Sequence, residues 1–178
     1  MAEQEIVKWQ EKPEDTEKAR LAQLRKLPRV LTAEQLDSQP WEDTGGGMYF
    51  RKWVLGGPNT PELPQTSFAS WFGVYAPGGY GKKHGHLFEA VFYIIEGEGH
   101  EIHDGKRYDW KPGCVALVHV GCVHQHFNAN KDKICKVLTI VPSSIYRQMN
   151  IGGSPTQIEI PPGPTEEAKG FIPGKATP

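Results

Sequence analysis

The chain has 178 residues, which is enough for one domain with a substantial hydrophobic core. Its 20 basic and 21 acidic residues leave a formal charge of −1, so it lacks the basic excess that nucleic-acid-binding proteins carry. The longest apolar run, residues 90–95, is too short to span a bilayer, and the charged N-terminus has no apolar signal core, so we expect a cytoplasmic protein that binds neither nucleic acid nor membrane.

Two helices are expected near the N-terminus. Residues 14–27 follow Pro13, carry leucine at positions 21, 24 and 27, and end before Pro28. Proline fits the first turn of a helix but interrupts its interior. Residues 32–36, TAEQL, begin with a pattern similar to a capping box and indicate a second, short helix. We assign residues 1–40 to a helical extension without chemistry of its own.

Short apolar stretches separated by glycine and proline follow from Trp41 onward. Strands this short, at nearly even spacing and with such turns between them, indicate an all-β sandwich or barrel. The Asp104–Gly105 pair is typical of a tight hairpin turn. We expect one β domain over residues 41–149, with strands within residues 48–55, 67–76, 90–95, 100–110, 114–120 and 134–141.

Residues 150–178 differ from the rest of the chain. They hold six prolines and five glycines and show no periodicity. We expect an extended arm that either hangs free or lies along a partner surface. Because such an arm often covers the edge strand of a sheet, we also expect a homodimer or larger assembly.

The stretch GYGKKHGHLFEAVFYIIEGEG, residues 79–99, contains the first candidate site. If the chain is regularly extended from His84, then His84 and His86 share a face with Ala90, while Glu89 points the other way. Two neutral imidazoles one pleat apart can bind one metal ion. The alternative is a pair of surface histidines in a Gly/Lys-rich loop.

A second cluster, GCVHQHFNAN, places His124, His126 and Asn128 on one face by the same alternation. A barrel with several intervening strands could bring this segment beside the first. A core or pocket histidine is the alternative for His126.

Both segments resemble the two motifs of the cupin family, which folds as a double-stranded β-helix, or jelly roll. The first motif, G-x5-HxH-x3–4-E-x6-G, is matched by Gly78, His84, His86 and Gly97. The second, G-x5-P-x-G-x2-H-x3-N, is matched by Gly113, Gly121, His124 and Asn128. His119 stands where the motif has proline. The resemblance covers roughly residues 68–142, and it implies the cupin fold.

The resemblance implies a metal site of His84, His86 and His124 with one departure from the family pattern. Counting back from Gly97 places Ala90 where the family's glutamate ligand stands, and Glu89 could replace it only through a β-bulge. Three neutral imidazoles leave a divalent ion its full charge and open positions. The set is similar to those of gentisate-type and acetylacetone-type dioxygenases, so Fe(II) is the leading metal, with Zn, Ni, Mn and Cu as alternatives.

The resemblance to these enzymes implies a non-haem iron dioxygenase that cleaves a C–C bond of a hydroxy-aromatic or enolisable carbonyl substrate with O2. Two alternatives stay open: an O2-independent isomerase, decarboxylase or lyase acting through an enolate, and a non-catalytic cupin that binds a small molecule. The candidate catalytic residues are His126, as proton shuttle, and Arg51, as a partner for a substrate carboxylate. The candidate pocket residues are Phe92, Ile94, Tyr75, Trp53 and His119. His103 is expected to be exposed beside the Asp-Gly turn.

Overall fold

The structure is a computed structural model that describes residues 13–55, 67–151, 156–159 and 163–174. The chain divides into two compact units, Met1–Val30 and Leu31–Pro178. No helix among the described residues is both long enough and apolar enough to cross a membrane.

The first unit contains helix α1 (Pro13–Arg25), which the sequence predicted within two residues at its C-terminal end. Beyond Arg25, the amides of Lys26 and Leu27 bond to the carbonyls three residues back, at Gln23 and Leu24. This tighter last turn ends the helix before Pro28, which has no N–H to continue it.

The second unit begins with helix α2 (Ala33–Ser38), and its predicted capping box is present. The Gln35 amide donates to Thr32 Oγ1 at 3.2 Å, and the Thr32 amide donates to Gln35 Oε1 at 2.9 Å. Two otherwise unpaired N–H groups at the start of the helix are satisfied in this way.

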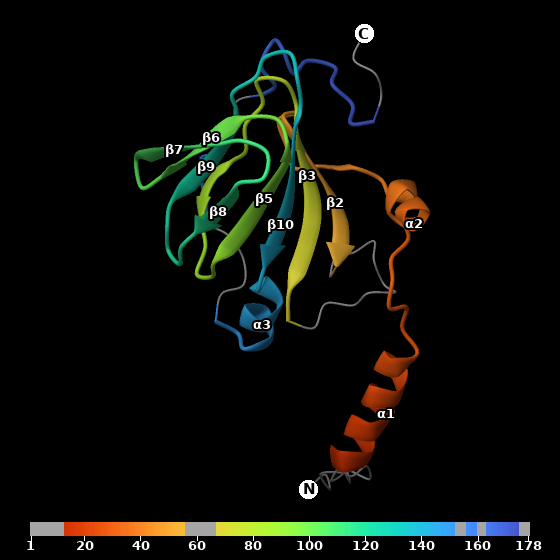
Figure 1. The fold of residues 1–178 in the computed structure, drawn as a ribbon. Coiled ribbons are helices and arrows are strands. Elements are labelled where there is room, and N and C mark those ends of the chain that lie inside the picture. The colour runs from red at the N-terminus through yellow and green to blue at the C-terminus, as the bar shows by residue number, and fades with distance from the viewer. Residues whose placement is uncertain (1–12, 56–66, 152–155, 160–162, 175–178) are drawn as a thin grey trace, which may run out of the picture. The chain divides into compact units, whose positions relative to one another are not determined.

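The described strands of this unit form two antiparallel sheets (Figure 1). One sheet has, in spatial order, β1 (Glu42–Asp43), β2 (Tyr49–Leu55), β3 (Ala69–Tyr75), β10 (Cys135–Val141), β5 (Ala90–Glu96) and β8 (Val115–Val118). The other has β11 (Thr156–Glu159), β4 (Lys83–Gly85), β9 (His124–Asn128), β6 (Gly99–His103) and β7 (Lys106–Trp110). Helix α3 (Ser143–Gln148) follows β10. This is the all-β jelly-roll architecture expected from the sequence.

Seven of the strands lie where the six apolar stretches predicted them, and the predicted hairpin joins β6 to β7. Asp104 and Gly105 both have positive φ angles, 46° and 84°, as a type I′ turn requires. Glycine adopts such angles without a Cβ clash, which explains why it occupies the second position.

The expectation of one regular strand from His84 onward is wrong. The chain bends at Leu87 and Phe88, so β4 lies in one sheet and β5 in the other. The alternation of side chains nevertheless survives the bend: Leu87 and Glu89 are exposed, whereas Phe88 is buried. The two histidines of the first motif therefore belong to the second sheet and Ala90 to the first.

The main hydrophobic core lies between inward-facing side chains of β3, β5, β10 and the loops around them. Its largest buried members include Tyr75, Ile94 and Val137, and Trp110 at the end of β7 closes it. The inward face of β9 is different, because its buried residues are His124, His126 and Asn128. Three consecutive polar side chains on a buried face are costly unless each is hydrogen-bonded, so this strand marks a candidate site.

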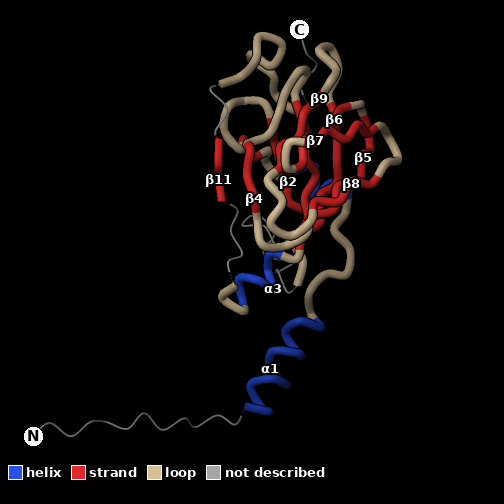
Figure 2. Tube along the Cα trace, turned by 90° about the vertical axis from the view of Figure 1, so that its left-hand side faces the viewer, coloured by secondary structure: helices blue, strands red, loops and turns tan. Residues whose placement is uncertain are grey.

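The described parts of the C-terminal arm lie along the same chain. Strand β11 pairs with β4 and covers the edge of the sheet that carries His84 (Figure 2). Further on, Ala168 is buried in a small second core with Met48 and Ala76, and Phe171 packs against it. The arm thus contributes both a strand and apolar anchors.

Asn128, at the end of β9, has a structural role. Its Nδ2 donates to the carbonyls of Ala76 and Lys133, both at 2.8 Å, and its Oδ1 accepts from the Asn130 amide. We expect Asn128→Ala to lower the free energy of unfolding by about 3 kcal/mol, because buried backbone groups lose their partners. Urea unfolding measures this, and Gln125→Ala, which removes a single hydrogen bond to the Gly81 carbonyl on the other face of the strand, is the comparison and should cost less. A loss below about 1 kcal/mol would refute the role.

Candidate metal centre

Three histidines from two adjacent strands converge at one end of the inter-sheet space. His84 on β4 lies directly opposite His124 on β9, and their ring centroids are 4.3 Å apart. His86 follows β4 immediately and lies 4.8 Å from His124, measured between ring centroids. Their ligating nitrogens all lie within 4.8 Å of one another. The structure therefore brings together the three residues that the two motifs singled out.

The hydrogen bonds of these histidines leave the same nitrogen available on each ring. The Nδ1 atoms of His84, His86 and His124 each contact a backbone carbonyl two residues away: that of Lys82 at 2.8 Å, that of Phe88, and that of Cys122 at 3.1 Å. A carbonyl only accepts, so each Nδ1 carries the hydrogen and each Nε2 keeps a lone pair. Backbone carbonyls commonly orient metal-binding histidines in this way.

Burial keeps the three rings neutral. It lowers the pKa of His84 to about 4 and that of His124 to about 2, and the neighbouring histidines add to both shifts; the pKa of His86 is also lowered, chiefly by burial. His124 Nε2 is fully buried and has no hydrogen-bond partner among the described residues. A cluster of neutral imidazoles with a buried, unpaired Nε2 fits a divalent cation.

No carboxylate belongs to this group among the described residues. Glu89 is exposed, on the opposite side of the chain from the histidines. Ala90, at the position of the missing glutamate, is buried and lines the cavity that His84 and His86 also line. The ligand set is therefore three histidines, without an acidic side chain.

The lowered pKa values predict how stability depends on pH in the metal-free protein. An unfolded histidine takes up a proton below pH 6.5, whereas folded His84 and His124 stay neutral to about pH 4 and about pH 2. Their contribution to stability is therefore complete above pH 6.5 and is lost as the pH falls from 6.5 to 4, by up to about 1.4 kcal/mol per pH unit for each histidine. Urea unfolding at pH 7, 6 and 5 tests this. A double variant with glutamine at both positions should show a flatter dependence, and an equal slope would contradict the prediction.

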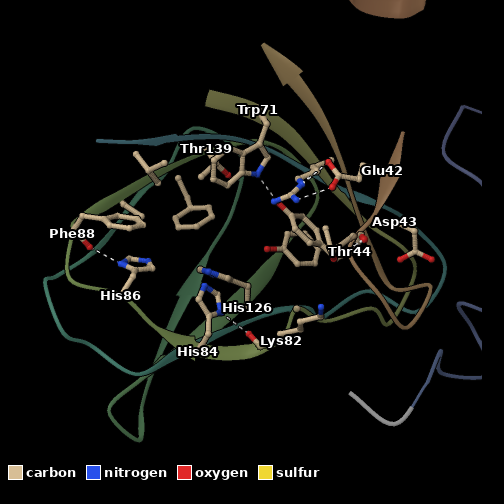
Figure 3. Close-up of a pocket in the computed structure, with 17 residues that line it drawn as sticks. Glu42, Asp43, Thr44, Trp71, Lys82, His84, His86, Phe88, His126 and Thr139 are labelled. Atoms are coloured by element: carbon tan, nitrogen blue, oxygen red, sulfur yellow. Dashed lines mark hydrogen bonds and ion pairs between the residues drawn. The ribbon is translucent and has the colours of Figure 1, made fainter. Parts of the chain in front are cut away.

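A cavity of about 490 Å³ is lined by two members of the group, His84 and His86, but not by His124 (Figure 3). His84 and His86 lie at one end of it, and His126 from β9 lies beside them. Its other walls are largely aromatic and apolar and come from Tyr49, Trp71, Tyr75, Phe88, Ala90, Phe92 and Val141. Such walls exclude water from the space next to a metal ion.

A polar network lines the far side of the cavity. Arg51 on β2 donates from Nε and an Nη to the two oxygens of Glu42, at 2.9 and 2.8 Å, and Trp53 Nε1 donates to the same carboxylate. Hydrogen bonding to Arg51 is the largest cause of the lowered pKa of Glu42. One edge of the guanidinium is thus already occupied, so a substrate carboxylate would have to use the remaining N–H groups of Arg51.

Tyr49 and Trp71 fix another part of the wall. Trp71 Nε1 donates to the Tyr49 hydroxyl at 2.7 Å, and burial raises the pKa of Tyr49 to about 12. The Tyr49 ring stacks on Tyr75, with 4.5 Å between ring centroids. Tyr49 therefore stays protonated at neutral pH and forms a rigid aromatic surface facing the cavity.

Of the other residues that the sequence predicted for the pocket, two line the cavity and three do not. Tyr75 and Phe92 line the cavity; Ile94 is buried in the core behind it. Trp53 packs its ring against Trp71 outside the lining. His119 is exposed and does not line the cavity.

Sequence reasoning missed the contributions of Glu42, Tyr49, Thr139 and Lys82 to the cavity, and that of Glu101 behind it. All except Lys82 lie on strands, where the alternation of side chains could have indicated that a polar residue points inward. The residues that they contact lie on neighbouring strands, however, and these are known only once the pairing of the strands is known.

Comparison with known proteins supports the fold. Residues 71–141 match the family model described as a cupin domain. A search of the curated proteins finds no match.

Many solved structures share the architecture. A salicylate 1,2-dioxygenase from Pseudoaminobacter salicylatoxidans in complex with gentisate is 15% identical with a TM-score of 0.57, over 83% of this chain and 36% of that one. A polyketide cyclase from Streptomyces resistomycificus is 15% identical with a TM-score of 0.56, over 78% of this chain and 96% of that one. An RmlC-like cupin from Shewanella frigidimarina is 20% identical with a TM-score of 0.52, over 65% and 91%. At these identities the likeness extends to the fold alone.

Proposed function

We propose that this chain, in which residues 71–141 match the model of a cupin domain, is a metal-dependent dioxygenase that uses Fe(II) and O2 to cleave a C–C bond of a hydroxy-aromatic or enolisable carbonyl compound. The observation that carries the proposal is the ligand set: three convergent, neutral histidines without a carboxylate, at the end of an aromatic cavity. A bound Fe(II) would supply Lewis acidity and redox chemistry with O2.

Binding and orienting the substrate, excluding water and moving protons depend on the chain's own residues. Neutral imidazoles leave the charge of a divalent ion uncompensated, which favours an anionic, chelating ligand. The aromatic wall of Tyr49, Tyr75 and Phe92 suits a planar ligand and keeps water away from it. The free N–H groups of Arg51 can orient an anionic group at the far side. His126, beside the three histidines, can accept a hydrogen bond from the ligand or move its proton.

A second candidate is an O2-independent isomerase, decarboxylase or lyase that works through an enolate. The buried Nε2 of His126 favours it, because a base close to a Lewis-acidic ion is what enolate formation needs. The structural neighbours include both a dioxygenase and a polyketide cyclase, so the fold does not separate the two candidates.

An oxygen-uptake screen separates these functions. Metal-free protein is reloaded anaerobically with Fe(II) and then tested with a panel of dihydroxybenzoates, catechols and β-dicarbonyl compounds. We expect O2 consumption with at least one of them, at least about 100-fold slower in His84→Ala, because an ion held by two ligands is bound weakly. His119→Ala, an exposed histidine outside the cavity, is the matched control.

Three other outcomes would count against the dioxygenase. Turnover that continues without O2, with zinc or nickel in place of iron, would establish the second candidate. Ligand binding that survives His84→Ala without any turnover would indicate a non-catalytic binding protein. Iron-loaded protein that consumes no O2 with any compound of the panel would refute the proposal directly.

We also propose that the protein forms a homodimer. The outer face of β8, β5 and β10 carries apolar side chains in two adjacent rows, which the strand register places side by side: Val115, Tyr93 and Leu138, and Leu117, Val91 and Ile140. Four of these side chains are exposed, and Val91 and Leu138 are half-buried. Monomers seldom expose a contiguous apolar patch across three strands. With a net charge of only −1, two copies repel each other little, so a second copy can cover this face.

Sedimentation tests the assembly. The wild-type protein should sediment as a dimer, and Leu117→Glu, which places a charge in the centre of the face, should sediment as a monomer. Wild-type protein that is monomeric at every concentration would refute the proposal. A Leu117→Glu variant that stays dimeric would show that the interface does not lie on this face.

A further inference from the structure

A buried glutamate lies directly behind the cavity. Glu101 on β6 is 1% exposed and faces inward, opposite His126 in the pairing of β6 with β9. Its Oε2 is hydrogen-bonded to His103 Nε2 at 2.7 Å and lies 3.1 Å from His126 Nδ1, close enough for a second hydrogen bond. Its Oε1 is buried and has no hydrogen-bond partner among the described residues. His103, expected to be exposed, is instead mostly buried by this contact.

A carboxylate in this position needs an explanation other than stability. Burying a charge between two sheets is costly, and an apolar side chain of the same size would usually pack at least as well. Burial raises the pKa of Glu101, but the contacts with His126 and His103 outweigh it, so the net effect is a lowered pKa and the group stays ionised. The residue therefore acts as an acceptor for two ring N–H groups.

The acceptor determines which nitrogen of His126 carries its hydrogen. A carboxylate cannot donate, so Nδ1 must carry a hydrogen, and in the neutral ring Nε2 then keeps its lone pair. Nε2 is buried, has no protein partner among the described residues, and belongs to a ring that lines the cavity. The ring is packed against Phe92, with 4.3 Å between centroids, which restricts its rotation.

We infer that Glu101 is a positioning residue that locks His126 with its hydrogen on Nδ1, so that the atom beside the three-histidine group is a hydrogen-bond acceptor. His103 completes the arrangement by holding Oε2 from the neighbouring position of β6. A ligand that fills the cavity has to bring a hydroxyl or N–H to this acceptor, because an apolar group there would leave a buried nitrogen unpaired. The use of this acceptor in catalysis rests on the proposed function, but the position of the hydrogen does not.

Nuclear magnetic resonance of the metal-free protein tests the inference. Nitrogen-15 labelling of the histidines reports which ring nitrogen carries the hydrogen, and His126→Gln identifies the His126 signals by removing them. We expect the hydrogen on Nδ1 in the wild type and in Glu101→Gln, whose amide oxygen can still accept. In Glu101→Leu, which offers no acceptor, we expect it to move to Nε2, the position that free imidazole side chains prefer in water.

The outcomes are distinct. A wild-type His126 with its hydrogen on Nε2 would overturn the inference even if no variant folds. A Glu101→Leu variant that keeps the wild-type pattern would show that Glu101 does not set it. Because this readout needs neither metal nor turnover, it tests the inference independently of the proposed function. If the enzyme is active, Glu101→Leu should lower kcat at least about tenfold without changing metal content, and Glu101→Gln should restore most of it.

Discussion

Replacing His124 with alanine is expected to weaken the binding of a divalent metal ion at least about 100-fold. Changing even a residue that only orients a metal ligand costs about 10- to 100-fold in affinity, so removing one of three ligands should cost no less. His124 is the central member of the set, since it lies across from His84 and close to His86. Anaerobic equilibrium dialysis with Fe(II), and aerobic dialysis with Zn(II), measures the loss.

Two controls make this result specific. His100→Ala removes a histidine that lies on β6 outside the group, where it stacks on Phe127, and should leave metal affinity unchanged. Thermal unfolding of metal-free His124→Ala checks that the variant folds. If a folded His124→Ala protein binds metal as tightly as the wild type, the ion is held elsewhere and the assignment of the site is wrong.

The Ala90→Glu variant is expected to bind metal about tenfold more tightly and to turn over substrate at least about 100-fold more slowly. Ala90 is the first residue of β5, is buried, and lines the same cavity as His84 and His86. A carboxylate placed there adds a charged ligand, which raises affinity for a divalent ion. The same carboxylate takes up a position that an anionic substrate needs, and it reduces the charge that attracts one.

Stability gives an independent readout of this variant. Without metal, a carboxylate buried at position 90 has no cationic partner in the group of neutral histidines, so the free energy of unfolding should fall by about 3 kcal/mol. Added metal should therefore raise the melting temperature of Ala90→Glu more than that of the wild type. Ala90→Gln has the same size without the charge and is the matched control. Equal shifts in the two variants would show that residue 90 cannot reach the ion.

The sequence was most informative where local rules decide the structure. The capping box at Thr32, the hairpin at Asp104–Gly105 and seven strands bounded by glycine and proline follow from short stretches of chain. The His84, His86 and His124 group could be expected as well, because two short motifs with fixed spacing carry it. These features depend little on distant contacts.

The remaining features depend on contacts across the fold. The bend at Leu87–Phe88 arises because the chain passes from one sheet to the other, which no local pattern signals. Strand β11 exists because β4 offers an unpaired edge. The roles of Glu42 and Glu101 depend on partners in neighbouring strands, Arg51 and His126. For the same reason, aromatic residues on adjacent strands could not be sorted into cavity wall and core, as Phe92 and Ile94 show.

X-ray absorption spectroscopy of the metal-loaded protein tests the central claim most directly, because imidazole rings give a characteristic multiple-scattering pattern that depends on their number. We expect one ion per chain, bound by three imidazole nitrogens at roughly 2.0–2.2 Å, with oxygen ligands from water or substrate in the remaining positions. The three-imidazole pattern should be lost in His124→Ala. Sulfur ligands, fewer than three imidazoles, or an unchanged spectrum in that variant would contradict it.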